Sequence, residues 1–274
     1  MNTIANGIQI EYDTFGDPSS PPLLLIRGGG SQMIMWDEVL CDLFARQGLY
    51  VIRFDNRDVG LSSKFDDIPY TFDDMADDSV GLLDALGIEK AHILGTSLGG
   101  MIAQTIAIRH PSRVWSLISL ASTTGGPALP LGDPEVYALI FAPASFEREE
   151  QIEHSVNFYM HLGGSKYPID EQEIRRVTEQ SYDRCFCPQG AKRQGEAIMA
   201  SGSRVQALRS ITAPTLVIHG SEDPIFPVEH ARATAEAIPG AELLIIEGMG
   251  HLFSAEVWPL LVDAIIHHTH KAGS

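Results

Sequence analysis

A serine flanked by small residues is the strongest chemical feature of this chain. Residues 91–94 are apolar, a Gly-x-Ser-x-Gly motif follows at 95–99, and residues 101–110 have the composition of a helix. A serine at such a strand-to-helix turn projects clear of the sheet, and its neighbours must be small for the turn to close. Because a serine hydroxyl is a weak nucleophile at neutral pH, Ser97 needs a base and an acceptor that orients the base.

Candidates for both partners follow later strands. Of ten histidines, His219 and His251 directly follow predicted core strands. His251 lies in a Gly-Met-Gly-His loop that suits a ring reaching back over the sheet, whereas His219 could equally be a satisfied core residue. Asp223 is the expected acid, with Glu222 as a substitute. Reactive groups of an open parallel sheet belong on loops after the carboxyl ends of strands, so we expect a triad of Ser97, Asp223 and His251.

The elements that must position these residues alternate between strand and helix. Apolar or alternating runs predict strands over 8–15, 22–26, 49–54, 114–121, 214–219 and 242–247, besides the one before Ser97. Helical patterns occupy 36–46, 72–86, 101–110, 227–238 and the end of the chain from about 259. This alternation predicts an α/β fold with a mostly parallel central sheet flanked by helices.

The alternation breaks between residues 122 and 208, which are rich in proline and aromatic side chains. Helical patterns there cover about 133–141, 147–162, 170–184 and 189–201. We therefore expect a helical cap at 122–208, inserted after the sixth strand, and a core domain made of 1–121 and 209–274. The apolar side chains of the cap should mostly form its own core, with some facing the sheet.

Taken together, these motifs resemble the α/β-hydrolase family over nearly the whole chain. The order Ser97, Asp223, His251 is the family's order. The turn at 55–62, Asp-Asn-Arg-Asp-Val-Gly-Leu-Ser, is similar to the Asp-x-Arg-x-x-Gly-x-Ser turn of its esterase, perhydrolase and lactonase branches. Among subgroups, the combination most resembles the anthracycline (aclacinomycin-type) methylesterases and related small carboxylesterases.

The resemblance implies a serine hydrolase that cleaves carboxylic esters of small to medium, apolar substrates through an acyl-enzyme. The oxyanion would be held by the backbone N–H groups of Leu98 and Gly29, in a loop shaped by Gly28 and Gly30. Where the family commonly has His-Gly, this chain has Arg27-Gly28. Arg27 would either favour anionic substrates or pair with a scaffold carboxylate, and we expect the pairing. The turn at 55–62 is expected to be scaffold rather than a catalytic element.

Several alternatives remain open. A cofactor-free perhydrolase, a lactonase or macrolide esterase, and a carbon–carbon bond hydrolase would all use the same triad. A non-catalytic ligand-binding protein on this fold is the alternative of a different class. The serine at position 97 argues against haloalkane dehalogenases and epoxide hydrolases, which use a carboxylate there.

The composition limits the kinds of molecule that the protein is expected to bind. The formal net charge of −17 over 274 residues argues against nucleic acid and anionic membranes. Three cysteines provide no disulfide framework, and the N-terminal residues lack a secretory signal. We expect a cytoplasmic monomer or homodimer that binds a small-molecule ester, with no cofactor and no metal. Four carboxylates at the start of the helix over 72–86 are assigned to its dipole rather than to a metal site: Asp73, Asp74, Asp77 and Asp78.

Overall fold

An eight-stranded sheet forms the centre of the computed structural model, which describes residues 1–66 and 68–273. Its strand order is β1-β2-β4-β3-β5-β6-β7-β8, antiparallel from β1 to β4 and parallel from β4 to β8. The strands are β1 (Asn2–Ala5), β2 (Ile8–Phe15), β3 (Pro22–Ile26), β4 (Tyr50–Phe54), β5 (Ala91–Thr96), β6 (Val114–Leu120), β7 (Thr215–Gly220) and β8 (Glu242–Ile246). The predicted α/β fold is confirmed, whereas β1 was not predicted.

Helices cover both faces of the sheet. Successive residues of a strand point to opposite faces, so Leu24 of β3 packs in one cluster with α2 and α3, while Leu23 and Leu25 pack in another with α1 and α10. The helices outside residues 122–208 are α1 (Glu38–Arg46), α2 (Phe72–Ala85), α3 (Leu98–Arg109), α9 (Glu229–Ala237) and α10 (Trp258–Ala272), and the short α8 (Val205–Leu208) ends that segment. Short 3-10 turns occupy Met33–Met35, Pro111–Arg113 and Ala255–Val257.

The carboxylates at the start of α2 all have partners within the protein. Asp74 completes a capping box with Thr71, which explains where the helix begins. Asp73 and Asp77 pair with Arg109 of α3, and Asp78 pairs with Arg57. Over 1–66 and 68–273, no cluster of three or more His, Cys, Asp or Glu side chains could hold a metal ion.

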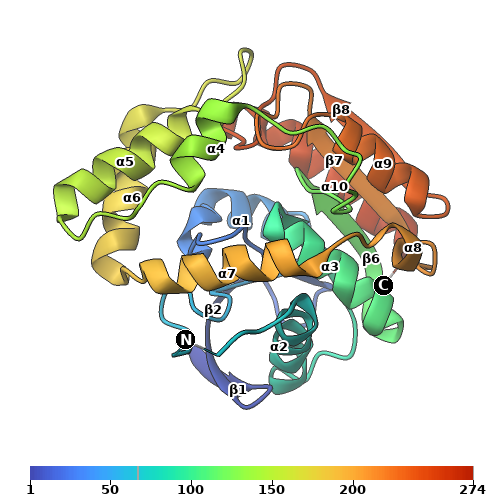
Figure 1. Cartoon of the computed structure of the whole chain (residues 1–274). Helices are drawn as coiled ribbons and strands as arrows, with labels where there is room; N and C mark the ends of the chain where they lie inside the picture. The colour runs from blue at the N-terminus through green and yellow to red at the C-terminus, as the bar shows by residue number, and fades with distance from the viewer. Residues whose placement is uncertain (67, 274) are drawn as a thin grey trace.

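Between β6 and β7 the chain forms the four longer helices α4 (Pro134–Ile140), α5 (Arg148–Met160), α6 (Glu171–Arg184) and α7 (Pro188–Ser201). Helices α4, α5 and α6 form a group on one side of the molecule, and α7 runs back from α6 toward α8 (Figure 1). The buried apolar residues of α4, α5 and α6 form a separate cluster, which Ile225 and Leu252 join from the loops after β7 and β8, whereas Ala197 of α7 packs with α2 and α3. The division into a core domain and a cap at 122–208 stays a prediction.

All three cysteines are free thiols. In the part of the chain that the structure describes, no helix combines the length and the hydropathy needed to cross a membrane.

Candidate active site

Ser97 lies at a strained turn between β5 and α3. Its backbone has φ 54° and ψ −120°, a conformation that residues other than glycine rarely adopt. Such strain costs on the order of 1–3 kcal/mol and persists only where the surroundings enforce it. Here the Ser97 N–H donates to the carbonyl of Leu120 (3.0 Å), and Ser122 Oγ donates to the carbonyl of Ser97 (2.8 Å). Strand β6 and the residues after it therefore hold the turn from both sides.

The glycines around Ser97 are required by close backbone approach. A Cβ atom on Gly95 would lie 2.0 Å from the carbonyl oxygen of Gly99. One on Gly99 would lie 2.1 Å from the carbonyl oxygen of Ile26, at the end of β3. Contacts this short would push backbone apart, so the Gly-x-Ser-x-Gly motif follows from the packing of α3 against β3 and β5.

The glycine loop after β3 lies directly beside the serine. A Cβ on Gly28 would be 3.2 Å from Ser97 Cβ, and one on Gly29 would be 3.6 Å from the Leu98 side chain. Leu98 is the first residue of α3, so its N–H has no acceptor within the helix. Over 1–66 and 68–273 the structure records no acceptor for the N–H of Gly29 either. Both predicted oxyanion donors are thus available on the side of Ser97.

Gly30 differs from its neighbours because its N–H is already bonded. It donates to Oε1 of Gln194 (2.7 Å), a fully buried residue of α7, and Gln194 Nε2 donates in turn to the carbonyl of Arg57 (3.0 Å). Gly30 has φ 67°, which favours glycine. Sequence reasoning missed Gln194, because nothing local marks a contact across 164 residues of chain.

Asp223 and His251 form the hydrogen bond expected of a base and its orienting acid. His251 Nδ1 donates to Oδ2 of Asp223 (2.7 Å), while Oδ1 accepts from the N–H groups of Ile225 and Phe226 (2.9 Å each). Burial alone would raise the pKa of Asp223, but the charge and hydrogen bond of His251 hold it below its usual value. The acid therefore remains a carboxylate, and the Nε2 atom of His251 is left available.

The two alternatives to these residues have other partners. His219 is completely buried and donates through Nε2 to the carbonyl of Phe226 (2.7 Å), and burial lowers its pKa. Glu222 faces the cap, where its carboxylate accepts from the N–H (2.6 Å) and Oγ (2.7 Å) of Ser165. The structure thus gives His219 a core position and Glu222 a tie between the loop after β7 and the cap.

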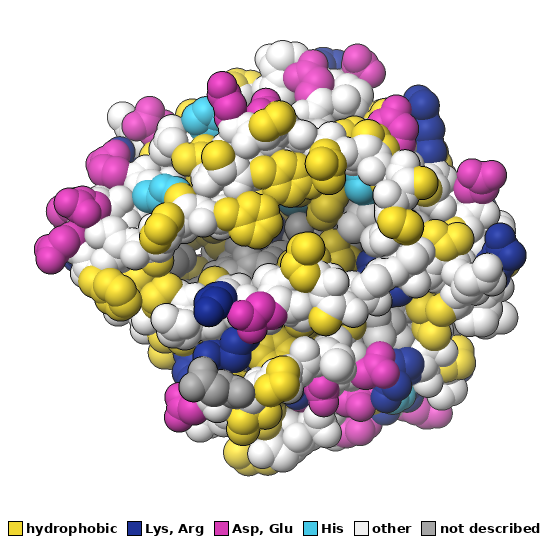
Figure 2. Space-filling model, in the orientation of Figure 1, with side chains coloured by type: hydrophobic (Ala, Val, Ile, Leu, Met, Phe, Trp, Pro, Cys, Tyr) yellow, Lys and Arg dark blue, Asp and Glu magenta, His cyan; other side chains and the backbone are white. Residues whose placement is uncertain are grey.

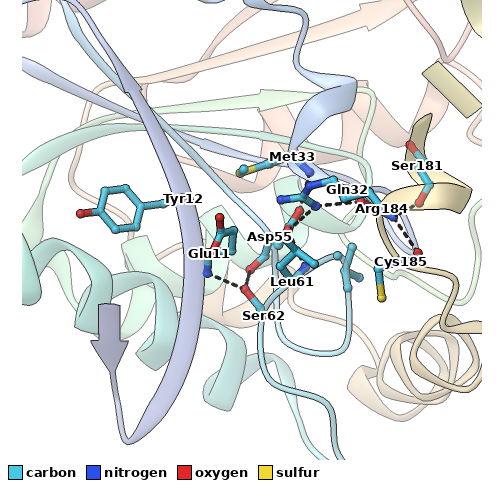
Figure 3. Close-up of polar contacts among 12 residues, drawn as sticks. Glu11, Tyr12, Gln32, Met33, Asp55, Leu61, Ser62, Ser181, Arg184 and Cys185 are labelled. Atoms are coloured by element: carbon cyan, nitrogen blue, oxygen red, sulfur yellow. Dashed lines mark hydrogen bonds and ion pairs between the residues drawn. The ribbon is translucent and has the colours of Figure 1, made fainter. Parts of the chain in front are cut away.

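The turn at 55–62 is anchored by its own backbone and by the cap. Asp55 accepts from the N–H groups of Met33 (2.8 Å) and Leu61 (2.9 Å), and from Arg184 Nη1 of α6 (2.6 Å). Figure 3 shows Asp55 between the turn and Arg184, with Gln32 beside them. Gln32 accepts from the same Arg184 nitrogen (2.7 Å) and donates to two carbonyls near the end of α6. These contacts give the turn the scaffold role that we expected.

A second cap arginine repeats this arrangement. Arg193 of α7 pairs with Asp58 through Nε (2.8 Å) and Nη2 (2.9 Å), and Asp58 also accepts from the N–H of Phe65. Burial would raise the pKa of Asp58, but the bonds from Arg193 and Phe65 keep it lowered. Sequence reasoning identified the carboxylates of the turn but not their partners in the cap.

The expected ion pair of Arg27 is not found. Over 1–66 and 68–273, this side chain pairs with no carboxylate, and its guanidinium lies over the rings of Trp36 (5.3 Å) and Phe253 (5.6 Å) instead. The prediction of a scaffold carboxylate was therefore wrong, since sequence alone does not show which charges meet in space.

The three predicted catalytic residues follow β5, β7 and β8, whose carboxyl ends lie along the same edge of the sheet. Within the described residues, no hydrogen bond joins Ser97 Oγ to His251. The case for Ser97 thus rests on its turn and on the adjacent N–H groups. In the face drawn in Figure 2, a hollow opens between the helices α4–α6 and α7, with hydrophobic side chains along its rim.

Comparisons with known proteins identify the family of this chain. A family model described as alpha/beta hydrolase fold matches residues 21–256. The chain is 34% identical to a rhodomycin D methylesterase of Streptomyces sp. (strain C5), covering 94% of this chain and 93% of the relative. It is 30% identical to a 2-hydroxymuconate semialdehyde hydrolase of Pseudomonas sp. (strain CF600), covering 90% and 86%. The resemblance predicted from the motifs is confirmed.

Among solved structures, a meta-cleavage product hydrolase from Pseudomonas fluorescens IP01 has a TM-score of 0.85 at 22% identity. The match covers 100% of this chain and 98% of that one. At this identity the likeness concerns the fold alone.

Proposed function

Because this chain belongs to the α/β-hydrolase fold family, we propose that it hydrolyses carboxylic esters through an acyl-enzyme intermediate on Ser97. The observation that carries the proposal is the Asp223–His251 hydrogen bond of 2.7 Å, on loops at the same sheet edge as the strained turn of Ser97. The 34% sequence identity with a rhodomycin D methylesterase, over 94% of this chain, supports an ester as the substrate.

In the proposed reaction, Ser97 Oγ attacks the ester carbonyl while His251 Nε2 accepts its proton. His251 then protonates the leaving alcohol, and the steps repeat with water as nucleophile to release the acid. Asp223 stays ionised, keeps the proton of His251 on Nδ1 and stabilises the imidazolium. The N–H groups of Gly29 and Leu98 bind the oxyanion, and losing one such donor typically costs about 3 kcal/mol of transition-state stabilisation.

The proposed substrates are small to medium esters with an apolar body, including methyl esters of polyketide acids. The hydrophobic rim of the hollow between α4–α6 and α7 supports this choice. Lactone hydrolysis, perhydrolysis and carbon–carbon cleavage would use the same groups, and substrate panels separate them. A cytoplasmic location, a monomeric or homodimeric state, and independence of nucleic acid, membrane and metal stay predictions.

Labelling by a fluorophosphonate probe tests whether Ser97 is an activated nucleophile. We expect stoichiometric labelling of the wild-type protein at Ser97, and none in Ser97→Ala. Ser203→Ala is a suitable comparison, because Ser203 is exposed and lies outside the turn of Ser97. It should still be labelled. An unlabelled wild-type protein with an unchanged fold would instead favour a non-catalytic ligand-binding protein.

A panel of methyl esters, aryl esters and macrolide lactones, measured with Ser97→Ala as control, then defines the reaction. Hydrolysis of an ester that disappears in Ser97→Ala is the expected result. Equal hydrolysis by both proteins would contradict the proposed function.

A further inference from the structure

Arg27 lies beside the site, and the proposed reaction does not use it. It directly follows β3 and precedes Gly28. A Cβ atom placed on Gly28 would lie 3.2 Å from Ser97 Cβ. The residue is only 5% exposed. A buried guanidinium normally needs acceptors, because an uncompensated charge in the interior costs several kcal/mol.

Other buried or half-buried arginines of this protein have such acceptors. The carboxylate pairs are Arg53–Asp13, Arg57–Asp78, Arg184–Asp55 and Arg193–Asp58. Arg204, also buried, donates to Gln104 Oε1 (3.2 Å), to Ser201 Oγ (3.3 Å) and to the carbonyl of Thr123 (2.7 Å). In the described residues, Arg27 has neither kind of partner, although acidic residues outnumber lysine and arginine by 36 to 19.

The guanidinium of Arg27 is nevertheless not completely enclosed by the protein. Among the described residues, some side-chain nitrogens have almost no accessible surface and no hydrogen-bond partner. Arg53 Nε and Trp36 Nε1 belong to this group, whereas no nitrogen of Arg27 does. Within residues 1–66 and 68–273 its nitrogens also have no hydrogen-bond partner, so each must keep some accessible surface. Burial lowers the pKa of Arg27 to about 10, so the side chain is still a cation at neutral pH.

The surroundings of Arg27 link it to both sides of the site. Trp36 and Phe253 lie 5.3 and 5.6 Å from its guanidinium carbon, and Phe253 is two residues beyond His251. Aromatic faces attract a cation but leave the edge of the guanidinium, with its N–H groups, free for a planar anion. From the cap, Tyr159 approaches the same loop, with its hydroxyl 3.5 Å from Ser31 Oγ.

We propose that the guanidinium of Arg27 binds a carboxylate of the substrate, so that the preferred ester carries one negative charge besides the scissile bond. The inference rests on the proposed function, because it places the charged group in the same site as Ser97. A carboxylate matches the single positive charge and can accept two parallel N–H bonds from the guanidinium. The substrate class is then a monoester of a dicarboxylic acid, or an ester with an acidic substituent on its apolar body.

Binding to a catalytically inactive protein tests the inference separately from catalysis. Calorimetry on Ser97→Ala would compare monomethyl dicarboxylates, from succinate to suberate, with methyl monocarboxylates of the same chain length. For at least one length we expect the charged ester to bind about tenfold more tightly, which is the scale of one charge-assisted hydrogen-bonded pair. The advantage should vanish in Ser97→Ala/Arg27→Met and survive in part in Ser97→Ala/Arg27→Lys.

Either of two binding results would overturn the proposal: no charged ester binding better than its neutral counterpart, or an advantage that persists in the Arg27→Met background. A different measurement tests the proposed function, which is contradicted if the wild-type protein hydrolyses no ester of either series. The comparison of the two series in Ser97→Ala does not require Arg27→Met to fold.

Thermal unfolding supplies the matched control. Arg27→Met removes a buried charge without stranding a protein acceptor, so its Tm should be unchanged or higher. Arg204→Met removes an arginine whose pKa is also lowered to about 10 by burial, but strands Gln104 and the carbonyl of Thr123. Its Tm should fall. An equal fall in both variants would make Arg27 a scaffold residue and contradict the proposal.

Discussion

At the scale of single residues, the ionised state of Asp223 matters most. Its side chain has no exposed surface, and burial alone would favour the protonated form. The bond from His251 and the N–H groups of Ile225 and Phe226 reverse that preference. His219 adds to this, with Nε2 3.3 Å from the same carboxylate. The acid is thus kept charged by the loop that carries it and by the base that it orients.

Asp223→Asn should keep the fold but replace the carboxylate that accepts from His251 Nδ1 with an amide, which can also donate. An amide at this position can donate to His251 Nδ1 and would leave the proton on the wrong nitrogen, so kcat should fall roughly 10³- to 10⁴-fold. Glu222→Gln is the control, since Glu222 bonds Ser165 rather than a histidine. Steady-state kinetics with one methyl ester measure both. A loss of less than about tenfold in Asp223→Asn would contradict the assigned role.

The same variant carries a pH signature. Because the pKa of folded Asp223 is lowered, its charge stabilises the fold above its unfolded pKa of about 3.9, and this stabilisation is lost as pH falls through the lowered pKa. The difference in unfolding free energy between wild type and Asp223→Asn should therefore shift steadily against the wild type as the pH falls below about 4. Urea unfolding across this range measures it, and a difference independent of pH would exclude the lowered pKa.

At the scale of elements, α7 contacts the loop after β3 that we propose binds the oxyanion. Gln194 connects the N–H of Gly30 to the carbonyl of Arg57, and Arg193 anchors the same helix to Asp58. The positions of Gly28 and Gly29 beside Ser97 therefore depend on a segment that lies 164 residues further along the chain from Gly30. The loop after β3 is not shaped by its own glycines alone.

Gln194→Met should loosen this loop. The thioether fills the volume but leaves the Gly30 N–H and the Arg57 carbonyl unpaired, each at a cost of about 1–3 kcal/mol. We expect a lower Tm and a fall in kcat that exceeds the change in KM, since the oxyanion forms only during the reaction. Gln189→Met is the control on the exposed side of α7. A lower Tm with unchanged kcat would limit Gln194 to a structural role.

At the scale of the whole molecule, local patterns predicted the strands, the helices and the three catalytic candidates. Each of these features has a pattern within a short stretch of sequence: apolar runs for β3 to β8, helical spacing for α4 to α7, and a motif at each strand end. Strand β1 was missed because four residues, Asn2–Ala5, offer too little pattern. The contacts of Arg184, Arg193 and Gln194 were missed because they join segments more than 100 residues apart.

The expectation for Arg27 failed for a related reason. In a chain with almost twice as many acidic as basic residues, a carboxylate partner is the simplest assumption. Only the fold shows that the side chain instead meets Trp36 and Phe253, which come from a short turn after β3 and from the histidine loop. The sequence predicted candidates for the reacting groups, and the three-dimensional packing was needed to infer the proposed charge of the substrate.

The central claim is that Ser97 and His251 act as one unit in ester hydrolysis, and a double-mutant comparison tests it most directly. The values of kcat for Ser97→Ala, His251→Ala and Ser97→Ala/His251→Ala would be measured on one ester. Residues that share a mechanism lose their contribution together, so the double variant should be no slower than the slower single variant. If the two losses instead multiply, Ser97 and His251 act independently and the proposed mechanism is contradicted.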